Sequence, residues 1–148
     1  MSTGLSLIVK TVTRLVSSFI MLFGIYIVLY GHVSPGGGFA GGVILAAGCV
    51  LLLLAFGHGP IKHILAHSIA VACDCTGAFA FLVIALLGYL AGTFFMNFLA
   101  LGEPGELFSA GAIPLSNLAI AIKVAAGLFG VFLALAAFRL ARKKEDPS

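Results

Sequence analysis

The chain has 148 residues, of which 61% are hydrophobic and 9% are charged, and its mean hydropathy is +1.22. Because a typical soluble domain carries about 25% charged residues, this composition excludes a water-soluble globular protein. Eight Lys and Arg against five Asp and Glu give a net charge of +3, which is too sparse for a nucleic-acid-binding surface.

Four apolar stretches are each long enough to cross a hydrocarbon core about 30 Å thick. They cover residues 15–31, 39–57, 69–95 and 118–140. We therefore expect an all-α polytopic membrane protein with four transmembrane helices, forming a single domain over residues 1–148 without repeats. Cations precede the first stretch as in a signal peptide, but no small-residue cleavage site follows, so we expect this span to be retained.

The cations predict the orientation of the spans. If the spans alternate in direction, every Lys and Arg near their ends falls on one side of the membrane. These residues are Lys10, Arg14, Lys62, Arg139, Arg142, Lys143 and Lys144. Because short cytoplasmic loops collect Lys and Arg, we expect both termini and the loop 57–68 in the cytoplasm, and the protein in the plasma membrane. Glu103 and Glu106 then lie outside, in a loop over residues 96–117 that we expect to be an ordered surface or re-entrant segment.

A glycine-rich segment, residues 34–42, leads from the first stretch into the second. Its spacing includes GxGxxG, but a membrane span precedes it where a dinucleotide site needs a buried strand, so that site is excluded. We interpret the segment as a tight turn followed by a helix start. Gly38, Gly42 and Ala46 recur every four residues, so another helix can approach this face closely. An ordinary glycine-rich turn is the alternative, although five glycines exceed what a turn requires.

Two charged residues, Asp74 and Lys123, lie inside the third and fourth stretches. Burying such a charge costs at least about 2.5 kcal/mol, which makes both of them candidates for a functional site. With the spans centred at one depth, a rise of 1.5 Å per residue puts the two roughly 20 Å apart in depth, so we do not expect them to pair within the chain. For Lys123 the alternative is snorkelling to the headgroups, and for Asp74 it is hydration near the cytoplasmic surface. Gly127 and Gly130 share a face with Lys123, which favours packing against another protein.

Other reactive side chains give weaker signals. Cys49, Cys73 and Cys75 lie in apolar stretches, and we expect them to be small core residues. His63 and His67 have a spacing that can hold zinc, with His58 nearby, but no further ligand completes a set and we expect no metal site. The pattern contains neither a catalytic triad nor paired catalytic carboxylates, so we expect neither an enzyme nor a bound cofactor.

Two segments resemble the MnhB-type subunit of the Mrp (Mnh) multisubunit sodium/proton antiporters: Thr11-Val12-Thr13-Arg14-Leu15 and Gly31-His32-Val33-Ser34-Pro35-Gly36-Gly37-Gly38-Phe39-Ala40-Gly41-Gly42. The second matches the family motif GHxxPGGGFxGG, and the resemblance extends over nearly the whole chain. The same type of subunit recurs in membrane-bound energy-converting hydrogenases. The segment from Asn117 to Val124 resembles the hydrogenase-associated members more than those of stand-alone antiporters. The parent complex therefore stays open between the two.

The resemblance implies an accessory, non-catalytic subunit that packs against other membrane subunits in the lipid bilayer of a complex that moves Na⁺ and H⁺. The elbow and packing residues that it implies are His32, Pro35, Gly36, Gly37, Gly38, Phe39, Gly41 and Gly42. Our hypothesis is that Lys123 and Asp74 meet polar groups of adjacent subunits along an ion route. A purely structural subunit is the first rival. An independent small channel is the second, although two internal charges offer little of a continuous polar path.

Overall fold

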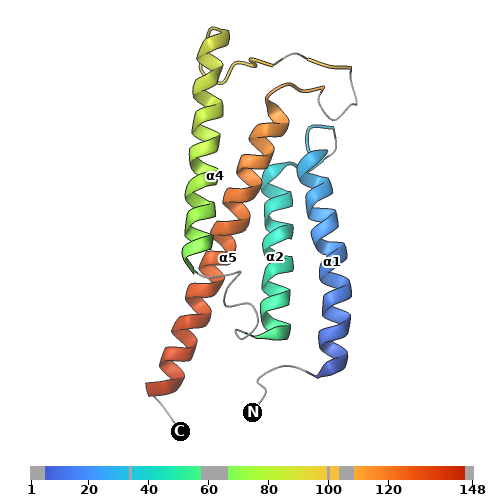
Figure 1. Ribbon diagram of the computed structural model, residues 1–148, viewed down its shortest axis with the longest axis vertical. Helices are drawn as coiled ribbons and strands as arrows, with labels where there is room; N and C mark the ends of the chain where they lie inside the picture. The colour runs from blue at the N-terminus through green and yellow to red at the C-terminus, as the bar shows by residue number, and fades with distance from the viewer. Residues whose placement is uncertain (1–5, 34, 58–66, 100, 104–108, 146–148) are drawn as a thin grey trace.

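The computed structural model describes residues 6–33, 35–57, 67–99, 101–103 and 109–145, and the side chains among them up to residue 138 except that of His67. Its long helices are α1 (Leu7–Leu29), α2 (Gly38–Phe56), α4 (His67–Leu87) and α5 (Ile113–Glu145), with a short 3₁₀ helix η1 (Gly88–Ala91) after α4 (Figure 1). All four long helices have the length and hydropathy to cross a membrane. This result confirms the predicted all-α fold with four spans, whereas the cytoplasmic location of the termini stays a prediction.

The third span ends earlier than the apolar stretch, which continues to residue 95. Gly92 has a φ of +128°, a conformation that favours glycine, and it ends the η1 turn. The chain then folds back, and the backbone N–H of Phe95 donates to the carbonyl of Ala85 at 3.2 Å. Hydropathy alone overestimated the length of the helix because the residues that fold back are themselves apolar.

The fourth span starts earlier than predicted, at Ile113. Pro114 lies in its first turn, where the N–H that proline lacks has no intrahelical partner to lose. The side-chain oxygen of Asn97 accepts hydrogen bonds from the N–H groups of Leu99 at 3.2 Å and Ala112 at 2.9 Å. The described parts of the predicted external loop are thus tied to the start of α5, while residues 104–108, including Glu106, lie outside the described residues.

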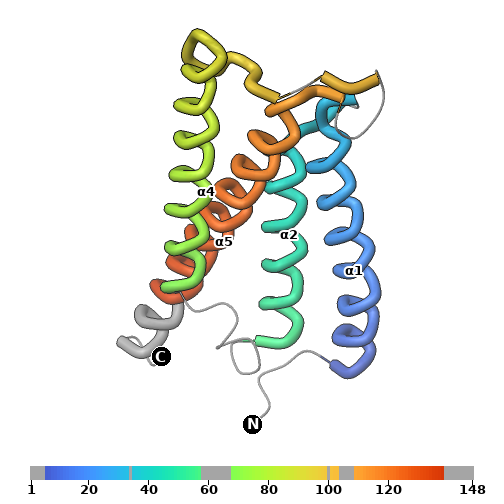
Figure 2. The backbone as a smooth tube through the Cα atoms, turned by 45° about the horizontal axis from the view of Figure 1, so that its top comes forward, coloured from blue at the N-terminus to red at the C-terminus, as the bar shows by residue number. Residues whose placement is uncertain are grey.

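The helices form an open row and not a closed bundle. In the described chain, α1 packs against α2, α2 against α5, and α5 against α4, with a smaller contact between α1 and α5, while the backbone of α4 stays away from those of α1 and α2 (Figure 1). Figure 2 shows that α5 is tilted and crosses between α2 and α4. Only 17% to 33% of the residues in each span are buried within the chain. Most of the lateral surface is therefore left for lipid or for other proteins.

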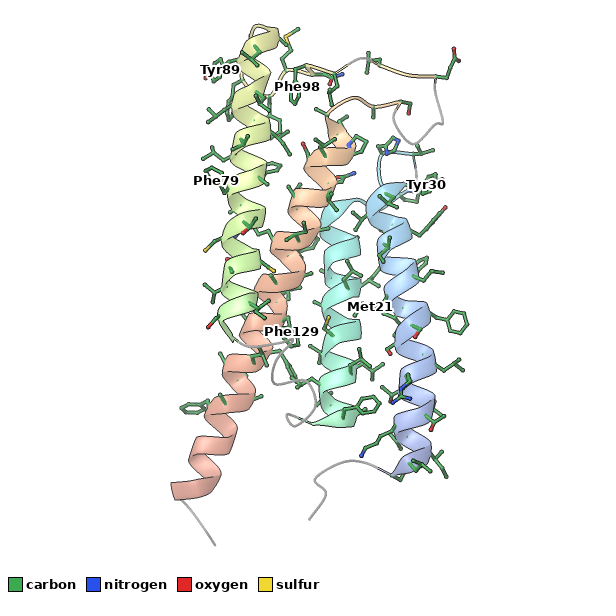
Figure 3. All side chains as sticks on the ribbon, in the orientation of Figure 1. Met21, Tyr30, Phe79, Tyr89, Phe98 and Phe129 are labelled. Carbon is green, nitrogen blue, oxygen red and sulfur yellow. The ribbon has the colours of Figure 1, made fainter. Side chains whose placement is uncertain are left out.

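The core is small and lies where three helices converge. Its buried cluster consists of Leu53 of α2, Ala70 of α4 and Phe129 of α5, the last of which is labelled in Figure 3. Beside them an apolar groove of about 320 Å³ lies between α1 and α2 on one side and α4 on the other, with α5 as its floor. Its described lining has no charged side chain. Phe79 of α4 and Tyr89 of η1, in contrast, point outward (Figure 3).

Candidate functional site

The two charged residues of the spans form an ion pair. Lys123 Nζ lies 3.0 Å from Asp74 Oδ1 and donates a hydrogen bond to it. The prediction that the two do not pair within the chain is therefore wrong. Their side chains are 49% and 38% exposed on the isolated chain, so neither is sealed inside the protein.

The prediction failed because it centred the two apolar stretches at one depth. The structure shows instead that α4 is displaced along α5: a Cβ added at Gly77 would lie 2.7 Å from the backbone nitrogen of Lys123 and 3.0 Å from the carbonyl oxygen of Ala119. Asp74, one turn before Gly77, then reaches the turn that carries Lys123. The axial register of two helices depends on such contacts, and hydropathy averaged over 20 residues does not contain it.

Two glycines follow Lys123 along α5, and the first of them lies beside Asp74. A Cβ at Gly127 would lie 3.4 Å from Asp74 Oδ1, and a Cβ at Gly130 would meet no atom within 4 Å. Lys has three N–H donors and a carboxylate has two acceptor oxygens, so the one hydrogen bond between them leaves further capacity on both groups. The pair can therefore bind polar groups or ions that approach from outside the chain.

The predicted glycine elbow, residues 31–42, brings α2 against both of its neighbours. Gly37 has a φ of +120° and precedes the first residue of α2. Gly38 lies directly against the backbone of Asn117 in α5, and a Cβ at Gly42 would lie 2.9 Å from the carbonyl oxygen of Ala121. On the other side of α2, Gly41 lies directly against Val28 of α1. Side chains at these positions would force the helices apart.

The remaining elbow residues lie nearer the surface. His32 is half-buried in the turn after α1, whereas Pro35 and Gly36 are exposed. Phe39 is 66% exposed although Gly38 before it and Gly41 two residues after it are buried, so its ring points away from the helix contacts. The structure thus separates elbow residues that pack within the chain from residues that face outward.

The sequence reasoning missed Asn117. Its side-chain oxygen accepts a hydrogen bond from the N–H of Gly38 at 3.3 Å and so caps α2 from a different helix. The first N–H groups of a helix lack intrahelical partners, and Gly37 has no side chain with which to bind them. The available signal was an amide side chain at the start of an apolar span, but only the fold shows that it faces the elbow.

The structure also bears on the predictions for the cysteines and the histidines. Cys73 and Cys75 are exposed and Cys49 is half-buried, so it was wrong to expect the first two in the core, because α4 packs on one side only. His67 begins α4, whereas His58 and His63 lie outside the described residues. In the described part of the chain, no three His, Cys, Asp or Glu side chains gather as a metal site would require.

Comparison with known proteins decides the family. Residues 8–130 match the model of a domain related to the MnhB subunit of Na⁺/H⁺ antiporters. The chain belongs to the MnhB family. This result confirms the resemblance inferred from the elbow motif.

Individual relatives match over part of their own length. A Methanocaldococcus jannaschii protein of uncharacterised function is 34% identical over 82% of this chain and 48% of its own length. A Na⁺/H⁺ antiporter subunit of Bacillus subtilis is 49% identical over 40% of this chain and 41% of its own length. In a solved structure of the membrane-bound sulfane sulfur reductase, an archaeal respiratory membrane complex, one chain matches with a TM-score of 0.68 and 31% identity. That match covers 88% of this chain and 57% of the solved chain, so this MnhB-type chain spans about half the length of these relatives.

Proposed function

We propose that this MnhB-type chain is a non-catalytic subunit of a multisubunit cation/proton antiporter module, and that Asp74 and Lys123 belong to its ion path. The single observation that carries the proposal is a half-exposed ion pair on two helices that have the length and hydropathy of membrane spans. Charged side chains inside a membrane face a bundle interior or a water-filled cavity, because hydrocarbon cannot solvate them. The exposed side of the pair therefore needs a neighbouring subunit or water.

The chemistry of the pair suits exchange between cations. The Asp74 carboxylate can bind the Lys123 ammonium, a proton or a hard cation such as Na⁺, whose preferred ligands are oxygens. A proton or Na⁺ arriving at the carboxylate weakens the bond to Lys123, and the released ammonium repels a second cation. Only one cation at a time then neutralises the site, as an exchange of Na⁺ for H⁺ requires.

The test is cation flux through the whole complex reconstituted in vesicles. Asp74→Asn and Lys123→Ala each remove one of the two groups between which a cation would exchange and leave the other unpaired, so we predict a fall in flux of about tenfold or more. Thr76→Ala is the matched control, because the Thr76 hydroxyl bonds only to Ala72 of its own helix in the described contacts. Wild-type flux in both charge variants, with the complex assembled, would refute the ion-path assignment.

A second candidate concerns the parent complex. The match to a chain of an archaeal respiratory membrane complex favours a redox-driven assembly over a stand-alone antiporter. In that case the chain is the same type of subunit in the membrane arm of an oxidoreductase whose catalysis belongs to its partners. Co-purification with electron-transfer subunits supports this candidate, and an active complex that contains antiporter subunits alone rejects it.

A further inference from the structure

Helix α5 is held on two sides over the same two turns. Gly38 and Gly42 of α2 contact Asn117 and Ala121 on one side. On the other side, Gly77 of α4 contacts the backbone of Lys123. Because these contacts reach backbone atoms, a shift of α5 along its axis would make a glycine meet a side chain.

Asn117 is the polar part of this contact. The N–H of Gly38 is part-buried and finds an acceptor in the Asn117 side chain, which comes from 79 positions further along the sequence. An unsatisfied N–H is costly in a membrane, where no water replaces the lost partner. The hydrogen bond therefore favours one position of α5 relative to the elbow.

We propose that Asn117 is a positioning residue, which together with the glycine elbow sets the axial register of α5 so that Lys123 reaches Asp74. Asn117 precedes Lys123 by less than two turns, and a displacement of one turn, about 5.4 Å, would carry the ammonium out of hydrogen-bonding range. The elbow thus acts on the ion pair through the helix that both contact. The consequence for transport rests on the proposed function, whereas the consequence for register does not.

A cysteine trap measures the register directly. With the native cysteines replaced by Ala, Asp74→Cys and Gly127→Cys place two thiols side by side, since the Cβ position of Gly127 opens onto the Asp74 side chain at 3.4 Å. Copper-phenanthroline in air oxidises the pair in the assembled complex, and the disulfide yield reports how often the helices hold this register. Asn117→Ala should lower the initial rate of disulfide formation by up to about fivefold, the change in the register equilibrium constant expected for one lost hydrogen bond.

Ser116→Ala is the control, because the Ser116 hydroxyl donates to the carbonyl of Ala112, directly before α5, and not to α2 or α4. Asn117→Asp keeps an acceptor for Gly38 and should restore the rate. If Asn117→Ala does not assemble, Gly42→Ala tests the next contact between the elbow and α5, since its Cβ would lie 2.9 Å from the Ala121 carbonyl, and it should also slow the trap. An unchanged rate in the assembled Asn117→Ala complex, or in Gly42→Ala where that variant replaces it, overturns the proposal.

Cation flux is measured separately in Asn117→Ala with Asp74 and Gly127 unchanged. This measurement distinguishes the positioning role of Asn117 from the proposed function of the ion pair. A slower trap together with reduced flux supports both. A slower trap with wild-type flux keeps Asn117 as the positioning residue and contradicts an ion path through the pair. An unchanged trap contradicts the positioning role whatever the flux.

Discussion

Gly77 brings α4 close to the backbone of α5 beside the ion pair. A Cβ there would lie 2.7 Å from a backbone nitrogen, so Gly77→Ala must separate the two helices. We predict a loss of about 1–3 kcal/mol in stability, the usual cost of overpacking, seen as a lower Tm of the chain in detergent.

Gly130→Ala provides the comparison on α5. No atom of the described chain lies within 4 Å of the added methyl group, and Ala favours a helix over Gly by about 1 kcal/mol. The Tm of the isolated chain should therefore stay constant or rise. Equal Tm values for the two variants would contradict the close contact at Gly77.

Single residues differ in how far the sequence reveals their role. Asp74 and Lys123 were identifiable as candidates because a charge in an apolar stretch is costly wherever the helix lies. Their pairing was not predictable, since it depends on the displacement of α4 along α5, which Gly77 permits. The role of Asn117 was not predictable for a similar reason, because its side chain binds the N–H of Gly38 only once the fold brings α2 beside α5.

At the level of the helices, the contact between α2 and α5 depends on Gly42. A Cβ at position 42 would already lie 2.9 Å from the Ala121 carbonyl oxygen and from the Cβ of Val124. The larger, branched side chain of Gly42→Leu therefore does not fit between the two helices. We predict that the variant no longer assembles, and that partner subunits fail to co-purify with it.

Ala47→Leu tests whether size alone matters, because Ala47 lies on the exposed part of the same helix. This variant should still pull down its partners if its face meets lipid. Normal co-purification with Gly42→Leu would show that the glycine face of α2 is dispensable.

The helices themselves were largely predictable, since runs of about 20 apolar residues have few alternatives to a membrane span. Their ends were not, because local features decide them. Pro114 allows α5 to start early, and Gly92 ends the helical run that follows α4. The arrangement of the helices in a row was not predictable from the sequence either. Every face of these spans is apolar enough to pack against another helix or to face lipid.

For the whole molecule, the positions of the charges predict one orientation. The start of α1 and the end of α5 lie at the same end of the row (Figure 1). There the Arg14 guanidinium lies over the Phe56 ring, 5.4 Å from its centre. Since Lys and Arg collect in the cytoplasm, we propose that this end faces inward.

Labelling of single cysteines tests this orientation in a cysteine-free background. A membrane-impermeant maleimide should label Glu103→Cys in intact cells and Lys10→Cys only after permeabilisation. The reverse pattern would contradict the assigned orientation, while leaving the ion pair and the fold unaffected.

The central claim is that Asp74 and Lys123 work as one unit in cation transport. A double-mutant cycle on flux through the reconstituted complex tests it most directly, with Asp74→Asn, Lys123→Gln and the combined variant compared at equal assembly. We predict that each single change lowers the flux about tenfold or more and that the combined variant is no slower than the slower single variant. Losses that multiply in the combined variant, or single variants with the flux of the unaltered complex, would contradict the claim.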